Sequence, residues 1–392
     1  MKIFMIAAFF PPVNMIGAVR PYQLAKYLVD QGHEVTVFTS FKDNYVSKDY
    51  NADLTGIEVV DVGFSSVLSA LDYENPNANK FKIIKRVLVH FSYPDHFIYK
   101  KNQYIKAIEE YISKNGLPNL IFSMALPFTL HSVAKEIKDK YENIKWIADN
   151  RDLWATTPYR KIPMFLRSID KKFENKIFKN ADLILVVTQH MKLMMEDYLP
   201  YNIEVIRNGF IEDSLGSHNE YKNSYDFVYT GGLYGGLRDL TPLFEALSFI
   251  KSNKQIDFFG SDKPIVEGYI AQYPELKINF NDKLPRDEIL KIQNSAEYLI
   301  IALGNSTFEK GVLTGKFYEY VRARKPIIAL CDEDGELAYL INKYNLGIAT
   351  RNYEKISDFI LNKKASIATV PVELTSNFQF SQLVETIEKF SI

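Results

Sequence analysis

The sequence predicts an α/β protein of two Rossmann-like, doubly wound parallel-sheet domains. Short apolar runs alternate with amphipathic helical segments along the chain, which is typical of repeated β-α units. The pattern restarts near residue 203, and 392 residues suit two domains of ordinary size. We therefore expect domains at 1–202 and 203–375, followed by a terminal helix at 376–392 that is free to pack back on the first domain.

The first domain opens with a continuous apolar run, KIFMIAAF (2–9), of the kind found in a parallel strand covered on both faces. A helix is predicted over 18–31, and Gly32 ends it. The same alternation predicts further strands at 34–40, 119–124, 145–150 and 181–188, with a helix at 129–141.

The second domain begins after a short segment at 204–210, which ends close to an Asn-Gly turn signal. A fresh strand, DFVYTGG (226–232), ends in glycines and leads into a helix over 239–250. Five more strands are predicted at 255–260, 277–282, 297–303, 325–331 and 347–350, before a last helix over 380–390.

Composition excludes several classes of protein. The single cysteine, Cys331, cannot form an internal disulfide, and six scattered histidines argue against a structural zinc site. No apolar run approaches the roughly 18–20 residues that span a bilayer. The start, MKIFMIAAFF, resembles a short signal sequence, but Pro11 and Pro12 follow at once, so we expect a cytoplasmic protein.

Charge is unevenly distributed along the chain. Residues 1–200 carry a net charge of +4 and residues 201–392 a net charge of −5. Two basic, aromatic-rich stretches lie at 80–106 and 159–179. They fit either solvated helix faces or a surface that rests on anionic lipid headgroups at the inner membrane face. No nucleic-acid motif accompanies them, so a nucleic-acid partner is not expected.

Ligands of doubly wound domains bind at the carboxyl ends of the strands, so the strand-to-helix junctions are the candidate sites. In the first junction, FFPPVNMIGAVR, Pro11 and Pro12 stiffen the loop and Gly17 allows close backbone approach. Arg20 lies in the first helical turn, where a cation opposes the helix dipole. This indicates either an anionic or hydroxyl-rich ligand, or a nearby carboxylate partner.

The second junction, WIADNRDLW (146–154), places Asp149, Arg151 and Asp152 directly after a strand and beside two tryptophans. Charged groups next to aromatic rings at a strand's carboxyl end suit a sugar site. The alternative is an Arg–Asp pair that only pins the loop.

The third junction, YTGGLYGGLRDL (229–240), runs through four glycines, among them Gly231 and Gly232, to Arg238. Backbone N–H groups at a helix start bind phosphate, and an arginine binds it bidentately. The stretch lacks the Gly-Lys-Ser/Thr of a P-loop. A flexible hairpin is the alternative.

The fourth junction, GVLTGKFYEY, begins at Gly311, and Gly315 closes its apolar loop. Lys316 and Glu319 are three residues apart at a helix start and so share a face. The lysine suits a diphosphate and the glutamate a ribose diol. The alternative is a surface ion pair worth a few tenths of a kcal/mol.

Taken in order, the four junctions resemble glycosyltransferase family 4, whose fold is called GT-B, over essentially the whole chain. FPP…G…R…LAKYL…GHEVTVFT (10–39) resembles its amino-terminal signature, and IRNGF (206–210) the turn that opens its second domain. ADNRDLW (148–154) and TGKFYEYVRARKPIIA (314–329) are similar to segments of bacterial members that build surface polysaccharides. The resemblance implies a cleft between the two domains.

The resemblance implies a hexosyltransferase-type enzyme that moves a sugar from a nucleotide diphosphate sugar with retention of anomeric configuration. Its acceptor would be a glycan or a lipid-linked glycan of capsule, O-antigen or other surface polysaccharide synthesis. The family needs no metal and no cofactor, and uridine is expected as the commoner donor base. Location would be cytoplasmic, with peripheral contact at the inner face of the cell membrane.

Carried over residue by residue, the catalytic group comprises Asp152, close to the accepting hydroxyl, with Asp149 and Arg151. Arg151 stands where the family has a histidine. Arg20 falls on the acceptor side. Donor binding is assigned to glycines of both domains and to polar or charged residues of the second: Gly17, Gly231, Gly232, Arg238, Gly311, Thr314, Gly315, Lys316 and Glu319.

Two donor positions depart from the family pattern. Gly232 stands where an arginine is usual, and Gly311 stands where the first of two glutamates is usual, with Glu309 two residues away. Arg238 takes a lysine position, and we expect Lys316 to supply the missing cation on the leaving diphosphate.

These departures keep two alternatives open: a catalytically degenerate GT-B scaffold and a nonhydrolysing sugar-nucleotide epimerase. A dinucleotide dehydrogenase is disfavoured, because the first junction contains no Gly-x-Gly-x-x-Gly.

Overall fold

The computed structural model describes residues 1–40, 50–63, 92–157, 164–210, 224–362 and 370–390. The chain divides into two compact units, the first formed by residues 1–187 and 191–206 and the second by residues 188–190 and 207–392. Each unit is a doubly wound α/β fold, as predicted. The boundary expected at 202–203 and the packing of the terminal helix remain predictions.

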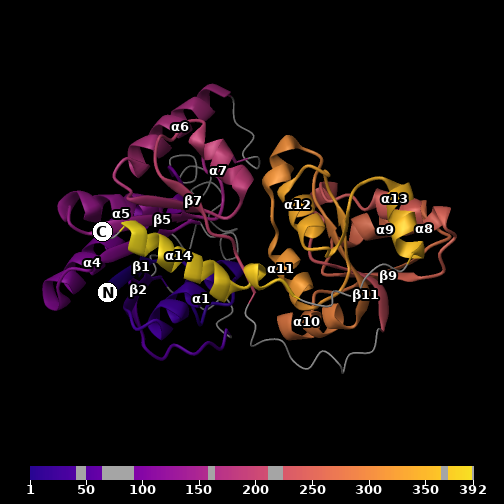
Figure 1. The fold of residues 1–392 in the computed structure, drawn as a ribbon, viewed down its shortest axis with the longest axis horizontal. Helices are drawn as coiled ribbons and strands as arrows, with labels where there is room; N and C mark the ends of the chain where they lie inside the picture. The colour runs from indigo at the N-terminus through magenta and orange to yellow at the C-terminus, as the bar shows by residue number, and fades with distance from the viewer. Residues whose placement is uncertain (41–49, 64–91, 158–163, 211–223, 363–369, 391–392) are drawn as a thin grey trace, which may run out of the picture. The chain divides into compact units, whose positions relative to one another are not determined.

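The first unit is built on a parallel sheet whose described strands run in the order β3-β2-β1-β4-β5-β6-β7. Figure 1 shows these strands with helices around them. The strands are β1 (Lys2–Ile6), β2 (Glu34–Thr39), β3 (Ile57–Asp61), β4 (Leu120–Met124), β5 (Lys145–Asn150), β6 (Leu183–Val186) and β7 (Ile203–Val205). All described pairs of this sheet are parallel, and the strand order reverses between β1 and β4, which places ligand-binding loops at the carboxyl ends of these two strands.

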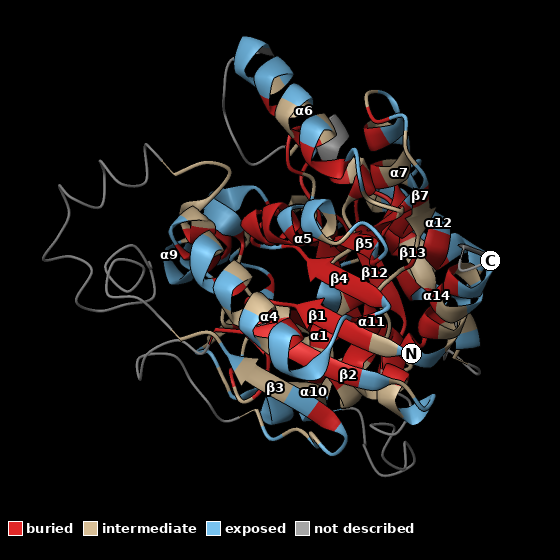
Figure 2. Ribbon diagram, turned by 90° about the vertical axis from the view of Figure 1, so that its left-hand side faces the viewer, coloured by how far each residue is buried: buried red, intermediate tan, exposed pale blue. Residues whose placement is uncertain are grey.

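Apolar side chains explain why this sheet is covered by helices. Phe4 and Ile6 of β1 pack in one buried cluster with Tyr104 and Ile108 of α4 and Leu130 of α5. Figure 2 shows the inner strands as buried and the outward faces of α4 and α6 as exposed. The described helices are α1 (Ile16–Asp30), α4 (Lys101–Asn115), α5 (Thr129–Lys140), α6 (Met164–Phe178) and α7 (Gln189–Glu196), with a 3-10 turn η2 (His96–Lys100).

The second unit repeats the plan with six described strands in the order β10-β9-β8-β11-β12-β13. Its strands are β8 (Tyr225–Thr230), β9 (Gln255–Phe259), β10 (Lys277–Asn281), β11 (Ala296–Ala302), β12 (Ile327–Leu330) and β13 (Gly347–Ala349). Two separate apolar clusters cover its faces, one around Leu299 and Phe317, the other around Ile300 and Phe244. Adjacent residues of β11 thus point to opposite faces, as in any parallel strand buried on both sides.

Helices α8 to α12 of the second unit alternate with its strands, and α13 and α14 follow the last strand. They are α8 (Thr241–Phe249), α9 (Lys263–Gln272), α10 (Arg286–Asn294), α11 (Gly315–Arg322), α12 (Glu336–Lys343), α13 (Tyr353–Leu361) and α14 (Ser376–Phe390). Short 3-10 turns are η5 (Tyr234–Gly236), η6 (Thr307–Gly311) and η7 (Val372–Leu374). Within the described ranges, no helix is long and apolar enough to span a bilayer.

Candidate functional site

The predicted site residues fall into two groups, each within one unit. Gly17, Arg20, Asp149, Arg151 and Asp152 lie in the first unit, at the ends of β1 and β5. The others lie in the second unit, around the ends of β8 and β11 and the start of α11: Gly231, Gly232, Arg238, Gly311, Thr314, Gly315, Lys316 and Glu319.

Arg20 and Asp149 form a buried bidentate ion pair. Arg20 Nε lies 2.9 Å from Asp149 Oδ2, and Nη2 lies 2.9 Å from Oδ1. Arg20 is 4% exposed and Asp149 is fully buried, and Nη2 also donates to the carbonyl of Ile206 at 3.1 Å. Of the two possibilities that the sequence left open for Arg20, the carboxylate partner is therefore present. Its acceptor-side role stays a prediction.

Arg151 joins the ends of two neighbouring strands to the start of α1. Its Nε donates to the carbonyl of Ala125 at 2.7 Å, and Nη1 donates to the carbonyl of Gly17 at 3.2 Å. A Cβ at Gly17 would come within 2.9 Å of the Phe9 ring, so glycine is required for this close approach. The next residue, Asp152, is exposed. The arginine thus ties the loop after β5 to the end of β4 and the start of α1, next to an exposed aspartate.

A buried polar network that the sequence did not reveal holds the end of β5. Trp146 Nε1 donates to Ser123 Oγ at 2.8 Å, and Ser123 Oγ lies 2.8 Å from His131 Nδ1. Because tryptophan only donates, the Ser123 hydroxyl donates to Nδ1, and His131 Nε2–H donates to Asn150 Oδ1 at 2.9 Å. Burial lowers the pKa of His131 to about 4, so the ring is neutral. The network fixes Asn150, directly before Arg151.

Lys316 is the central cation of the second group. Its Nζ lies 4.3 Å from the centroid of the Tyr229 ring. Gly231 has a φ of +90°, and a Cβ there would lie 3.1 Å from Lys316 Cε, so this glycine makes room for the lysine. Burial, reinforced by the charge of Arg238, lowers the pKa of Lys316 to about 8. An anion bound between the two cations would relieve their repulsion.

Arg238 is held by neutral and acidic partners of its own unit. Its Nη1 donates to the carbonyl of Ala302 at 2.8 Å, and its guanidinium carbon lies 5.3 Å from the centroid of the Tyr234 ring. Its Nη2 lies 3.7 Å from Glu309 Oε2, and both side chains are about nine-tenths buried. The structure therefore brings Glu309, which the sequence placed two residues out of register, next to a predicted donor residue.

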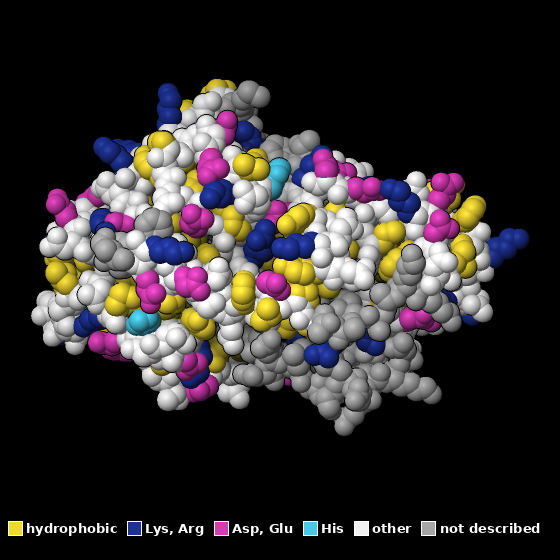
Figure 3. Space-filling view, viewed as in Figure 1, with side chains coloured by type: hydrophobic (Ala, Val, Ile, Leu, Met, Phe, Trp, Pro, Cys, Tyr) yellow, Lys and Arg dark blue, Asp and Glu magenta, His cyan; other side chains and the backbone are white. Residues whose placement is uncertain are grey.

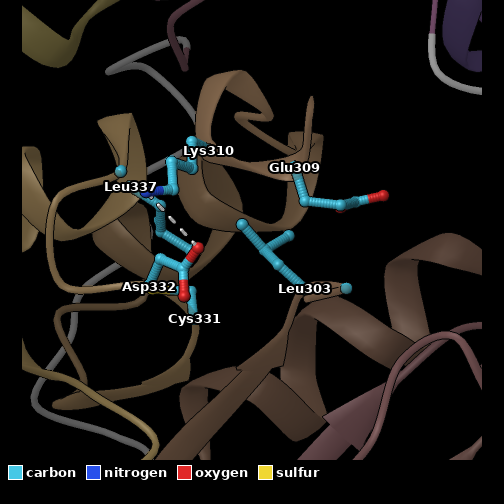
Figure 4. Close-up of a pocket in the computed structure, with 8 residues that line it drawn as sticks. Leu303, Glu309, Lys310, Cys331, Asp332 and Leu337 are labelled. Carbon is cyan, nitrogen blue, oxygen red and sulfur yellow. Dashed lines mark ion pairs between the residues drawn. The ribbon is translucent and has the colours of Figure 1, made fainter. Parts of the chain in front are cut away.

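Glu309 also borders a small pocket at the end of β11. Figure 4 shows its side chain turned away from Lys310 and Asp332, which form an ion pair on the other side. The labelled lining residues are Leu303, Glu309, Lys310, Cys331, Asp332 and Leu337. The carboxylate is thus directed to Arg238 rather than to the neighbouring lysine.

The surface ion pair between Lys316 and Glu319, which the sequence left open as an alternative, is not formed. Glu319 Oε2 accepts from Gln293 Nε2 at 3.0 Å, and its Oε1 lies 3.6 Å from Arg286 Nη2. Thr314 occupies the N-cap position of α11, and its buried Oγ1 has no hydrogen-bond partner in the described chain. The Glu319 carboxylate is therefore held by Gln293 and Arg286, while the Thr314 hydroxyl has no hydrogen-bond partner among the described residues.

Gly232 and Gly311, where the resemblance predicts an arginine and a glutamate, differ in their surroundings. Gly232 has no left-handed φ, and a Cβ built there meets nothing within 4 Å. Gly311 is buried in η6, and a Cβ there would lie 2.4 Å from the His190 ring. Packing therefore demands glycine at 311 and permits other residues at 232. Among the described residues, no group of His, Cys, Asp and Glu side chains could hold a metal ion.

Comparison with known families decides the identity of the fold and its class. The model of Glycosyltransferase Family 4 matches residues 17–213, half of the chain. The chain belongs to glycosyltransferase family 4. It is a glycosyltransferase, as the sequence predicted, and its fold is GT-B. A comparison with curated proteins gives no match.

Solved structures share this fold at low sequence identity. Sucrose-phosphate synthase from Thermosynechococcus elongatus is 14% identical, with 100% of this chain and 99% of that chain covered and a TM-score of 0.67. A glycosyltransferase from Rickettsia africae is 15% identical, with 100% and 98% covered and a TM-score of 0.66. Anabaena Alr3699/HepE in complex with UDP-glucose is 13% identical, with 99% and 100% covered and a TM-score of 0.62.

Proposed function

We propose that this glycosyltransferase moves a sugar from a UDP-sugar to a glycan or lipid-linked acceptor in bacterial surface-polysaccharide synthesis, with retention of configuration and without a metal. One observation carries the donor assignment: Lys316 lies against Gly231 at the end of β8, and burial together with the charge of Arg238 lowers its pKa. Two cations without a metal ion suit a departing diphosphate, whose developing charge they stabilise.

Glu319 of the second unit suits the ribose of the nucleotide. Glu319 presents carboxylate oxygens that would accept hydrogen bonds from ribose hydroxyls, while Gln293 and Arg286 orient it. The choice of uridine is supported by the similar Anabaena structure, which holds UDP-glucose, and by its complex with UDP and glucose. In the first unit, the exposed Asp152 would receive the proton of the accepting hydroxyl, with Arg151 ordering its loop.

A surface-polysaccharide role is supported by the similar structure of the lipopolysaccharide outer core galactosyltransferase WaaB, 11% identical over 99% of each chain with a TM-score of 0.60. A lipid-linked acceptor requires that the enzyme meet a membrane. The two basic stretches 80–106 and 159–179 fit either such a membrane surface or solvated helix faces. Residues 80–91 and 159–163 of these stretches lie outside the described residues.

The described part of the first basic stretch is mostly engaged within the protein. Lys100 is fully buried, and Lys101 Nζ lies 2.6 Å from Glu136 Oε2. Lys106 is exposed, and its Nζ lies 3.7 Å from Glu110 Oε1. These residues leave little free positive charge for a membrane.

Helix α6 offers the better membrane surface. Phe165 and Ile169 lie one turn apart and are 66% and 55% exposed. Lys172 and Lys176 continue the same exposed face. Where Figure 1 draws α6, the surface view in Figure 3 shows Lys and Arg side chains beside hydrophobic ones. Apolar residues that enter the headgroup region next to lysines are the arrangement of an interfacial helix. We infer that this face contacts anionic lipid.

The experiment that tests the donor assignment is a thermal-shift screen against UDP, GDP, ADP, TDP and CMP, with magnesium and with EDTA. A ligand at a hundred times its dissociation constant stabilises by about 2.7 kcal/mol, which raises the melting temperature by several degrees. We expect a shift with UDP that EDTA leaves unchanged. A rise in melting temperature that requires magnesium would contradict metal independence. A rise with another nucleotide in place of UDP would contradict uridine as the donor base.

The degenerate scaffold is the second candidate, because Gly232 and Gly311 replace an arginine and a glutamate of the family pattern. Nucleotide binding without turnover against any acceptor would favour it. Interconversion of a nucleotide sugar without an acceptor would favour the epimerase instead.

A further inference from the structure

A buried carboxylate on the inner side of α6 contacts the loop that follows β5. Glu174 is 1% exposed, and its Oε2 accepts from the backbone N–H of Ala155 at 3.1 Å. The same oxygen accepts from the hydroxyl of Tyr198 at 2.8 Å. An acid this deeply buried is costly to ionise, so its retention next to a loop backbone needs a reason.

Two turns earlier on α6, Arg167 contacts the same loop with a positively charged side chain. Its Nη1 donates to the carbonyl of Ala155 at 3.2 Å and to the carbonyl of Thr157 at 2.9 Å. Ala155 thus has its N–H held by an acid and its carbonyl held by a cation of one helix. Charge-assisted hydrogen bonds of this kind are about twice as strong as neutral ones.

The loop held in this way also carries an aromatic anchor. Trp154 is 1% exposed and stacks on Phe128, with ring centroids 5.2 Å apart and planes at 16°. Phe173 of α6 packs edge-to-face with the same indole, with ring centroids 5.7 Å apart and planes at 71°. Three residues earlier, the same loop begins with Arg151 and Asp152. Any displacement at residues 154–157 therefore reaches the two residues assigned to the reacting sugar.

We propose that Glu174 and Arg167 form a clamp that positions the 151–157 loop, and with it Arg151 and Asp152, for sugar transfer. Both are positioning residues, because neither touches the predicted substrate site directly. The catalytic part of this proposal rests on the proposed function. The structural part, that the clamp orders the loop, does not.

The clamp changes charge in the neutral pH range. Burial raises the pKa of Glu174 to about 7, and the neighbouring Asp170 adds to this effect. Tyr198, the Ala155 N–H and Lys171 act in the opposite direction. When the carboxylate is protonated, its bond to the Ala155 N–H loses the charge assistance. The loop is therefore expected to be held more firmly above pH 7 than below it.

The test uses Trp154 as its own reporter. The chain has two tryptophans, so Trp146→Phe leaves Trp154 as the single emitter. We expect its fluorescence to change between pH 5.5 and 8.5 with a midpoint near 7, and the change to disappear in Glu174→Gln. Glu142→Gln, an exposed glutamate of the same unit, is the matched control and should keep the midpoint. A midpoint that survives in Glu174→Gln overturns the clamp.

Hydrogen exchange gives a second measurement that needs no tryptophan substitution. In the otherwise native chain, amides of 151–157 should exchange at least tenfold faster in Arg167→Met than in wild type, whereas Arg167→Lys should lie between. Equal rates in all three proteins also overturn the proposal.

Turnover then separates the two parts of the inference. With a donor found, Glu174→Gln should lower kcat severalfold with little change in the donor KM and should remove the step near pH 7 from the kcat profile. An unchanged kcat profile beside an altered loop refutes the positioning role. If no donor is found but the fluorescence step near pH 7 is present, the proposed function is contradicted and the loop clamp is still supported.

Discussion

Lys316 is the residue on which the donor assignment depends. Its replacement by alanine removes the cation beside Gly231, and a charged hydrogen bond is worth about 1.5–3 kcal/mol. We therefore predict that Lys316→Ala binds UDP roughly 10- to 150-fold more weakly, as measured by the thermal shift. Lys263→Ala, at an exposed lysine of α9, is the control. Equal shifts in the two variants would remove Lys316 from the donor site.

His131 makes the first unit sensitive to acid. Its pKa is lowered from 6.5 to about 4 in the folded protein, so between these values only the unfolded chain takes up the proton. Stability is then present above pH 6.5 and is lost as the pH falls towards 4, by about 3 kcal/mol in all. We predict that the melting temperature of wild type falls over this range and that His131→Gln, which cannot be protonated, shows a smaller fall. Parallel pH curves would contradict this.

At the level of single residues, the sequence predicted neighbours along the chain better than partners across it. Gly231 and Lys316 meet because strand ends gather at one edge of a sheet, which a motif at each end indicates. The bond between Arg20 and Asp149 joins residues 129 positions apart, and no local pattern reports it. Glu174 was overlooked for the same reason, because an acid on an amphipathic helix reads as a solvated residue until its burial is known.

Helix α6 carries an opposite pH dependence. Burial raises the pKa of Glu174 from 4.5 to about 7, because the cost of desolvating the carboxylate outweighs its stronger hydrogen bonds to Tyr198 and Ala155, so the folded state as a whole prefers the protonated acid. This stabilisation is complete below pH 4.5 and is lost as the pH rises to 7, by about 3 kcal/mol. We predict that Glu174→Gln, which keeps an oxygen acceptor for Ala155, melts higher than wild type at pH 8 and that this advantage shrinks towards pH 5. A variant less stable at pH 8 would show that the charged form is the favoured one.

The segment 206–210 shows why an Asn-Gly turn was predictable when its cause was not. Phe210 pairs with Thr375, and the N–H of Ser376 donates to the carbonyl of Phe210 at 2.9 Å. A Cβ at Gly209 would lie 2.3 Å from the backbone nitrogen of Ser376. Backbone cannot yield as a side-chain tip can, so Gly209→Ala is predicted to destabilise the second unit by about 1–3 kcal/mol. Gly268→Ala, where a Cβ meets nothing within 4 Å, is the control in unfolding experiments.

At the level of elements, long buried strands were easier to predict than edge strands. Central strands such as β1 and β5 are apolar throughout, and the predicted ranges 2–9 and 145–150 contain them. The edge strand β3, with the short sequence IEVVD, was missed, because only Ile57 of it is buried and nothing in the pattern separates it from a loop. No helix is predicted over α4, whose first six residues end the basic stretch 80–106, although Tyr104, Ile108 and Ile112 repeat at helical spacing.

For the molecule as a whole, contact with a membrane is a prediction that requires a binding experiment with lipid. We expect the protein to float with liposomes that contain anionic lipid at low salt and to be released at high salt, because charge attraction is screened. Lys172→Glu combined with Lys176→Glu should reduce binding, whereas the same change at Lys263, in the second unit, should not. If the protein does not bind anionic liposomes at low salt, the prediction that the exposed face of α6 contacts a membrane is wrong.

Gly232 and Gly311 differ in the side chains that they could accept. Neither backbone conformation nor packing holds glycine at 232, so a longer side chain would find open space there. At 311 the His190 ring stands in the way, and a side chain could enter only after that ring had moved or changed. One position can thus be redesigned by a single substitution, while the other needs a second change at its neighbour.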